Sequence, residues 1–446
     1  MQEWPGEFLG RMKLLMGDDY RSFLQGLSEP APVSIRINPE KRINNFQDQQ
    51  KVKWCEAGYY LDKRPSFTFD PLFHAGCYYV QEASSMFLES VFKHCFPGDD
   101  PLKALDLCAA PGGKSTHLSS LLPADSILVS NEIIPQRNKT LRHNLAKWGD
   151  SNVIVTQQEV DDFLPLSGYF DLILVDAPCS GEGLFRRDPN AANEWSEDAV
   201  NHCAHRQENI LNTAIKLLKP GGVLIYCTCT FENSENESQI ERLIKENNAE
   251  LIELNSGFEE IVKTGFGLRF YPHRVMGEGF FISAIRNIDG EEGVLKKIKS
   301  DKSSSAGHDF LNRFLREPEA FSSIQKENTL YAIPNHMLPL FQFMENKFYI
   351  RQAGIRIGEI KGADLQPAYE LALSSNIAKD IPLYNFSLED AIRYLRCDMV
   401  TCQNAEKGWT LAAYEGCPIG WIKVLDHRVN NYFPKELRVL KEYVPE

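Results

Sequence analysis

Two cysteines in this sequence stand where a thiol could attack a carbon atom. Cys179 belongs to the segment DAPCSGEG and Cys229 ends the segment VLIYCTC, and each directly follows an apolar, strand-like run. If these strands are parallel neighbours, both thiols lie at one edge of the sheet. A thiolate can add to carbon 6 of a pyrimidine, which makes carbon 5 nucleophilic enough to take a methyl group from a sulfonium donor. Asp176 could hold or donate a proton at N3 of cytosine during this addition.

Other interpretations of the cysteines have less support. A free cysteine is most often a small buried side chain, and we expect this of Cys227. A zinc site that combines Cys227 and Cys229 with Cys179, Cys203 or His205 lacks paired ligand spacing, because the sequence has no CxxC pair. We therefore expect no metal, and the thiols favour covalent chemistry.

A glycine-containing turn upstream could bind the methyl donor. The strand-like segment KALDLC leads through AAPGG into a helix near Ser115, and Gly112 and Gly113 allow a ligand to approach the backbone beside the helix N-terminus. The next strand ends in Glu132, about twenty residues on, where a carboxylate can accept hydrogen bonds from both ribose hydroxyls. Neither GxGxxG nor GxxxxGK[ST] occurs here, which disfavours NAD, FAD and ATP. The turn and the acid together predict an adenosine-containing cofactor.

The pattern of strand-like and helical segments around these residues indicates an α/β fold. Between residues 99 and 290, strand-like runs alternate with amphipathic helical segments, which predicts a doubly wound, mainly parallel, Rossmann-like sheet. Residues 1–98 predict a small α+β appendage that binds RNA. Residues 291–308 are rich in charge, Ser and Gly and predict a linker. Residues 309–446 contain a hairpin pattern, WTLAAY-EGC-PIGWIKV, and predict a β-rich module.

The composition excludes several classes of protein. A chain of 446 residues with 43% hydrophobic residues can form sizeable cores, which excludes wholesale disorder. No apolar run approaches the length of about 18 residues that a membrane-spanning helix needs, and the N-terminal segment carries acids where a signal peptide would be basic. The 11 cysteines lack paired spacing, as expected for reduced thiols in the cytoplasm. The net charge of −13 means that any nucleic-acid binding must be local.

Taken together, the motifs resemble those of a known family. In chain order they are SIRIN, GCYYVQEASSM, DLCAAPGGKSTHL, DAPCSGEG, RRDPNAANEW, LKPGGVLIYCTCTFENSENE and YPHRVMGEGFFISA. They resemble the signature segments of the Sun-type RNA cytosine-C5 methyltransferases, which use S-adenosylmethionine. The resemblance covers most of residues 30–290 and implies a Rossmann-like methyltransferase core and methylation of cytosine carbon 5 in RNA.

The resemblance also implies a role for individual residues. Cys229 is the nucleophile, Cys179 assists release of the methylated RNA, and Asp176 and Lys114 lie near the target base. The implied cofactor contacts are Ala109, Ala110, Pro111, Gly112, Gly113, Lys114, Glu132, Arg137, Glu159 and Asp176. The sequence departs from the family pattern at Glu159, where a shorter Asp is expected, and at Cys227, where Ser is common.

The expected partner is a structured RNA. A stacked cytosine cannot present carbon 6 to a thiolate, so the target base must be single-stranded or flipped out. Arg186 and Arg187 could clamp the flanking phosphates, and Trp195 could stack on a base or pack in the interior. The tail is similar to the PUA-like RNA-binding domain of family members that act on 16S rRNA of the small ribosomal subunit. In this tail, aromatic and basic residues interleave, as on an RNA-binding surface. These residues are Trp409, Trp421, Lys423, Tyr432, Phe433, Lys435 and Arg438. Trp409 lies in a strand-like run and fits a core position better.

Alternatives remain at this point. The catalytic motifs alone also fit a tRNA cytosine-C5 methyltransferase. Amino-group methylation of a base or protein would need no thiol and typically uses an NPPY or DPPY loop, which DAPC does not match. From another class, the chain could be a catalytically inactive, RNA-binding ribosome assembly factor, although the two intact thiols favour an enzyme. We expect a monomer without a membrane partner.

Overall fold

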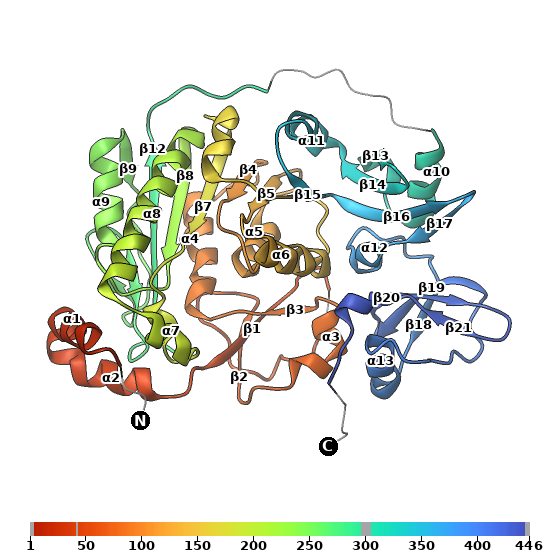
Figure 1. Cartoon of the computed structure of the whole chain (residues 1–446), viewed down its shortest axis with the longest axis horizontal. Coiled ribbons are helices and arrows are strands. Elements are labelled where there is room, and N and C mark those ends of the chain that lie inside the picture. Colours follow the sequence, from red (N-terminus) through yellow and green to blue (C-terminus); the bar gives the residue numbers. More distant parts are fainter. Residues whose placement is uncertain (1–3, 42, 296–304, 442–446) are drawn as a thin grey trace.

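A large mixed β-sheet forms the centre of the computed structural model, which describes residues 4–41, 43–295 and 305–441 (Figure 1). Five strands run parallel in the order β8-β7-β4-β5-β6. They are β4 (Lys103–Asp106), β5 (Ile127–Asn131), β6 (Val153–Thr156), β7 (Phe170–Asp176) and β8 (Leu218–Thr228). The antiparallel strands beyond β8 are β12 (Phe280–Asn287), β11 (Leu268–Phe270), β10 (Val262–Lys263) and β9 (Ala249–Leu251). The predicted fold class is confirmed.

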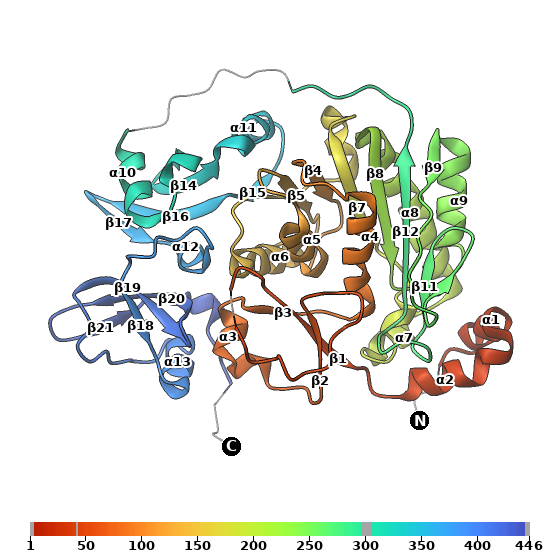
Figure 2. The same cartoon turned by 180° about the vertical axis from the view of Figure 1, so that it is seen from behind.

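Helices cover both faces of this sheet, which explains why its central strands are apolar along almost their whole length. One face packs against α4 (Leu88–Cys95), α5 (Gly113–Leu121) and α6 (Pro135–Trp148). The other face packs against α8 (Glu197–Leu217), α9 (Glu237–Glu246) and α11 (Leu338–Glu345). Figure 2 shows the same arrangement from behind.

The N-terminal region forms two helices and a small antiparallel sheet of order β2-β1-β3. Its elements are α1 (Gly6–Met16), α2 (Tyr20–Ser28), β1 (Val33–Ile37), β2 (Gly58–Leu61), α3 (Pro71–His74) and β3 (Tyr78–Val80). Phe8 and Phe23 pack in one cluster with Phe185 and Trp195, which flank α7 (Pro189–Glu194), and with Phe231, which follows β8. The N-terminal helices therefore brace the loops that follow the two cysteine motifs.

The C-terminal region contains two four-stranded sheets. The first consists of β13 (Phe321–Lys326), β14 (Thr329–Pro334), β16 (Ile355–Lys361) and β17 (Asp364–Pro367). The second consists of β18 (Leu383–Asn385), β19 (Gly408–Tyr414), β20 (Cys417–Val424) and β21 (Val429–Asn431). Besides α11, the helices of this region are α10 (Ser305–Phe314), α12 (Tyr369–Leu373) and α13 (Leu388–Leu395). The predicted hairpin is present as β19–β20, and its turn places Glu415 and Gly416 at positive φ.

Two boundaries differ from the sequence prediction. Strand β15 (Ile350–Ala353) pairs with the edge strand β6, so one strand from the C-terminal region belongs to the central sheet. An unpaired edge strand exposes backbone donors and acceptors, and β15 covers this edge. The segment predicted as a linker, 291–308, overlaps α10, which begins at Ser305, and residues 296–304 lie outside the described part of the chain.

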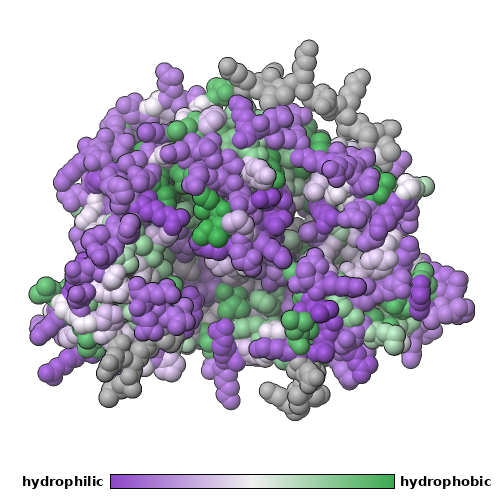
Figure 3. All heavy atoms as spheres, in the orientation of Figure 1, coloured by the Kyte–Doolittle hydropathy of each residue, from purple (hydrophilic) through white to green (hydrophobic). Residues whose placement is uncertain are grey.

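The face of the molecule seen in Figure 3 is mostly polar. Small hydrophobic patches lie near its middle and lower rim. Among the described helices, none has the length and apolar character that crossing a membrane would require.

Candidate active site

The two cysteines singled out from the sequence lie side by side. Cys229 directly follows β8 and Cys179 lies three residues beyond β7, and these strands are parallel neighbours. Their Sγ atoms are 3.1 Å apart, and the Cys229 N–H donates to the Cys179 sulfur at 3.3 Å. The contact with Cys229 and burial together raise the pKa of Cys179 well above its ordinary value. Cys179 therefore keeps its proton at neutral pH, which makes it a thiol donor beside a second sulfur.

An ion pair stands next to this thiol pair. The Lys114 Nζ atom lies 2.9 Å from an Asp176 carboxylate oxygen and over the ring of Phe280 at 5.2 Å. Burial would lower the pKa of Lys114, but Asp176 outweighs it and the pKa is raised, so the ammonium stays charged. The site thus contains a fixed positive charge and a carboxylate near two sulfur atoms.

Two buried glutamates tie the cysteine loops together. Glu182 accepts hydrogen bonds from Trp195 Nε1, Thr230 Oγ1 and Phe231 N, at 2.7, 2.7 and 2.8 Å. Glu235 accepts from the Ser180 N–H at 3.0 Å, from the Ser180 hydroxyl and from Gln207 Nε2. Burial raises the pKa of Glu182 to about 7. Each carboxylate joins the loop after β7 to a neighbouring segment, which fixes the distance between the two sulfurs.

A glycine is needed where the two loops meet. A Cβ atom on Gly183 would lie 2.8 Å from the carbonyl oxygen of Cys229 and 2.4 Å from that of Gly279. Its N–H donates to the same Cys229 carbonyl at 2.8 Å. A side chain at position 183 would push the two loops apart, so close packing of the loops requires the glycine that ends the segment SGEG.

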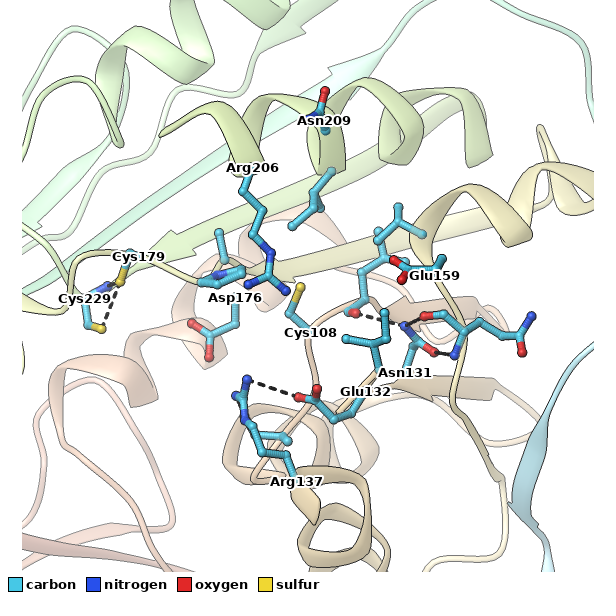
Figure 4. A pocket seen from close by; sticks show the side chains of 18 of the residues that line it. Cys108, Asn131, Glu132, Arg137, Glu159, Asp176, Cys179, Arg206, Asn209 and Cys229 are labelled. Carbon is cyan, nitrogen blue, oxygen red and sulfur yellow. Dashed lines mark hydrogen bonds and ion pairs between the residues drawn. The ribbon is translucent and has the colours of Figure 1, made fainter. Parts of the chain in front are cut away.

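A cavity of about 360 Å³ opens beside the thiols at the carboxyl edge of the sheet (Figure 4). Among the predicted site residues, those that line it are Ala110, Glu132, Arg137, Glu159, Asp176, Cys179 and Cys229. Glu132 is buried at the end of β5, and its carboxylate accepts from the Ile134 N–H at 2.8 Å and faces Arg137 at 3.4 Å. The cavity is the size of a small-ligand pocket. An acid at the strand end and sulfur atoms at the far wall fit S-adenosylmethionine.

The turn after β4 stands beside this cavity. Gly112 has a φ of 115° before α5, and Arg137 donates to the Ala110 carbonyl at 2.9 Å. Asp106 accepts a hydrogen bond from Ser115 at 2.6 Å and anchors the helix start. The helix begins at Gly113, two residues before the predicted start. Five of the predicted cofactor residues belong to this turn but do not line the cavity, namely Ala109, Pro111, Gly112, Gly113 and Lys114.

Glu159 also has a structural role at the start of a 3₁₀ segment. It caps the 3₁₀ segment Val160–Leu166, and its N–H donates to the Asp162 carboxylate at 3.2 Å. Its side chain is exposed on the cavity wall.

The three residues near the Cys179 loop that were considered for RNA binding differ in their exposure and contacts. Arg186 donates to the carbonyls of Glu29, Pro30 and Gly277, so its guanidinium joins the N-terminal region to the core. Arg187 is exposed, with Glu278 at 3.8 Å. Trp195 is buried and packs against Phe8, which decides between the two alternatives for it.

The tail differs from the interleaved surface expected from its sequence. Trp421 and Phe433 are buried, as is Trp409, so these rings form core contacts and do not stack on RNA. The expectation of an aromatic RNA surface is therefore wrong for Trp421 and Phe433, whose rings pack in the interior, whereas the core position expected for Trp409 is observed. Three basic residues keep exposed or half-exposed side chains, namely Lys423, Lys435 and Arg438.

Sequence reasoning missed several residues of the cavity, among them two polar residues of α8. Arg206 and Asn209 on α8 line it, and Figure 4 shows the Arg206 side chain pointing from α8 toward Cys108 and Asp176. They lie in an ordinary amphipathic helix, and only its placement over the strand ends gives them a role. The helix pattern carried no local signal for this.

Comparisons with known proteins agree with this geometry. The chain resembles a methyltransferase homolog protein from Pyrococcus horikoshii, with 30% identity and a TM-score of 0.55 over 64% of this chain and 96% of that one. It also resembles NSun6 from Pyrococcus horikoshii, solved with SFG, an analogue of S-adenosylmethionine, at 21% identity and a TM-score of 0.54 over 65% and 100% of the chains, which shows the fold. In class, the molecule is therefore a Rossmann-like methyltransferase.

Family models then define the class more closely. The model described as 16S rRNA methyltransferase RsmB/F matches residues 97–286, that of the RsmF N-terminal domain matches 4–83, and that of the methyltransferase RsmF PUA domain matches 382–439. Ribosomal RNA small subunit methyltransferase F of Aliivibrio fischeri strain MJ11 is 30% identical over 97% of both chains, and that of Erwinia tasmaniensis is 26% identical over 97% and 96%. The chain belongs to the ribosomal RNA small subunit methyltransferase F family. The predicted enzyme class, RNA (cytosine-C5-)-methyltransferase, and the predicted cofactor are confirmed.

The position of Glu132 gives a first prediction. Glu132→Gln should weaken S-adenosylmethionine binding about tenfold to a hundredfold, because a charged acceptor contributes roughly 1.5–3 kcal/mol to a hydrogen bond with a ligand. Calorimetric titration of the purified chain measures this. Glu250→Gln, an exposed position on β9, serves as the matched control. Equal affinity of wild type and Glu132→Gln for S-adenosylmethionine would show that Glu132 does not bind the cofactor.

Proposed function

We propose that the chain methylates carbon 5 of a cytosine in 16S rRNA of the small ribosomal subunit, with Cys229 as the nucleophile. The observation that carries the proposal is the 3.1 Å contact between Cys229 and Cys179 at a cavity that Glu132 and Asp176 also line. The names of the relatives, which refer to small-subunit rRNA, support this substrate.

The residues divide the chemistry among them. The Cys229 thiolate forms a bond between its Sγ atom and carbon 6 of an unstacked cytosine, and electron density moves through the ring toward N3. The Lys114–Asp176 pair provides a charged donor and an acceptor for the polar edge of the base, which stabilises this density. S-adenosylmethionine, when bound, supplies the methyl group to carbon 5.

Release requires the sulfur to leave. The proton on carbon 5 passes to solvent water, and its electron pair re-forms the double bond between carbons 5 and 6 while the bond between Cys229 Sγ and carbon 6 breaks. The sulfur departs as a thiolate. Cys179 keeps its proton because its pKa is raised, and its S–H can hydrogen-bond to this sulfur. We therefore assign Cys179 to the release step.

Residues that hold the cofactor surround the same cavity. Glu132 would accept hydrogen bonds from the ribose, Ala110 and Arg137 would close the pocket beside the turn after β4, and Glu159 and Asp176 would flank it. For the RNA backbone, Arg187 is the exposed cation beside the Cys179 loop. The tail supplies Lys423, Lys435 and Arg438.

Methyl-transfer assays test the substrate directly. The purified chain is incubated with S-adenosylmethionine carrying a labelled methyl group and, in parallel, with 16S rRNA, small subunits and bulk tRNA. We expect label in 16S rRNA or in the subunit, and bisulfite sequencing with and without the gene should find one cytosine that depends on the chain. Label confined to tRNA would replace the rRNA assignment, and no label in any RNA would favour the inactive assembly factor.

A further inference from the structure

A second cavity lies where the methyltransferase core meets the C-terminal region. Its volume is about 390 Å³, and its walls come from α6, β15, β16, β17, α12 and residues 432–437. The last segment belongs to the matched PUA domain. None of its lining residues lines the cofactor cavity, although α6 contributes to both, with Arg137 in one and Arg142 in the other. We call it the junction cavity.

Three polar side chains on its wall lack partners. Within the described chain, the side chains of Arg142, Tyr369 and Glu370 make no hydrogen bond or ion pair, and Arg142 Nε, Tyr369 OH and Glu370 Oε2 are buried. Arg356 on the same wall, by contrast, pairs with Glu359 at 2.9 Å. Buried polar groups are usually satisfied, so unpaired ones call for an explanation. A guanidinium and a carboxylate that line one cavity without pairing leave room for a ligand between them.

The charges on the wall argue against a free phosphate. Lys139, Arg142 and Arg356 are balanced by Glu359, Glu370 and Glu436. Burial lowers the pKa of His143 to about 3, so this ring is neutral and adds no charge. Carboxylates would repel an anion, whereas a neutral ring with both donors and acceptors suits this mixture.

Among the nucleobases, guanine matches the unpaired groups best. A carboxylate only accepts hydrogen bonds, and guanine offers two adjacent donors, N1–H and N2–H, on one edge. A guanidinium only donates, and guanine offers O6 and N7 as acceptors. Single-stranded RNA is recognised through such splayed bases. Apolar side chains that could contact the ring faces are Ala146, Pro367, Ala368, Pro434 and Leu437.

We infer that the junction cavity binds a guanine base of the substrate RNA, away from the cytosine that is methylated. Glu370 accepts from the N1–H and N2–H edge, Arg142 donates to O6 or N7, and the Tyr369 hydroxyl supplies a further hydrogen bond. The inference rests on the proposed RNA substrate. It gives the enzyme a second point of attachment, so that a guanine at a fixed distance helps to select the target.

Nucleotide titration of the full-length chain tests the inference. GMP, AMP, CMP and UMP are titrated by calorimetry in the presence of saturating S-adenosylmethionine, which occupies the cofactor cavity, and we expect GMP to bind at least tenfold more tightly than the other three. Glu370→Gln should remove this preference, since an amide keeps one acceptor and places a donor against N1–H. Tyr369→Phe removes only an unpaired hydroxyl and should weaken GMP binding without unfolding. Glu389→Gln, exposed on α13, is the matched control and should bind GMP as wild type does.

The outcomes separate this inference from the proposed function. With 16S rRNA as substrate, Glu370→Gln should raise the KM for RNA about tenfold and leave kcat and S-adenosylmethionine affinity unchanged. Equal binding of all four nucleotides to wild type, or wild-type GMP affinity in Glu370→Gln, would overturn the guanine assignment while methyl transfer continued. A chain that binds GMP selectively but transfers no methyl group would support the cavity and contradict the proposed reaction.

Discussion

Cys229→Ala is expected to abolish methyl transfer to RNA, with a loss of at least about a thousandfold, and to leave S-adenosylmethionine binding intact. Losses of this size follow removal of a covalent nucleophile. The only other described thiol in contact with Cys229 is Cys179, and its raised pKa keeps it protonated. The cofactor contacts expected from Glu132 do not involve this sulfur. Initial rates with labelled methyl donor, together with calorimetric titration of the cofactor, measure both effects.

A second cysteine variant controls for loss of a thiol as such. Cys402 is half-buried in the C-terminal region and does not line the cavity, so Cys402→Ala should transfer methyl groups at the wild-type rate. Transfer by Cys229→Ala at a rate close to wild type would show that the roles of the cysteines are wrongly assigned.

The thiol pair could be predicted because β-sheet topology follows from the chain pattern. Two apolar runs separated by a helical segment form neighbouring parallel strands, and their carboxyl ends meet at one edge. Cys229 follows the end of β8 directly and Cys179 lies three residues beyond β7, so their proximity can be predicted without knowing how the side chains pack. The same reasoning placed Glu132 at the end of β5.

Contacts between regions far apart in the chain could not be predicted this way. Strand β15 has the sequence IRQA, which carries no strong strand pattern, and its pairing with β6 depends on how the C-terminal region folds back. Helix α11 packs in the same core as α8 and α9. Local sequence patterns describe single elements, and these contacts come from tertiary packing.

The polar support of the site has the same origin. Glu182 and Glu235 each bind donors from segments separated in sequence, and their burial is visible only in the folded chain. Burial also overturned the expectation for Trp421 and Phe433, because interleaved aromatic and basic residues look alike whether the rings face RNA or a core. The unpaired groups of the junction cavity likewise come from α6 and α12, two helices with no sequence motif in common.

Cys179→Ala should trap a covalent complex between the protein and its RNA. Attack by Cys229 needs only its own thiolate, so addition to carbon 6 and methylation of carbon 5 can proceed. In the wild-type chain the Cys179 sulfur lies 3.1 Å from the Cys229 sulfur, and its S–H can stabilise the departing thiolate. The variant lacks this S–H, so departure of the sulfur is slowed.

The adduct should appear as a species of reduced mobility on a denaturing gel, containing both protein and labelled RNA. Turnover should fall at least about a hundredfold, as is typical when a hydrogen-bond donor that stabilises developing negative charge is removed. Nuclease treatment should return it to the mobility of the free chain. The double variant Cys179→Ala with Cys229→Ala should form no adduct, because no nucleophile remains. An adduct that persisted in the double variant, or rapid turnover by Cys179→Ala without any adduct, would mean that release does not depend on Cys179.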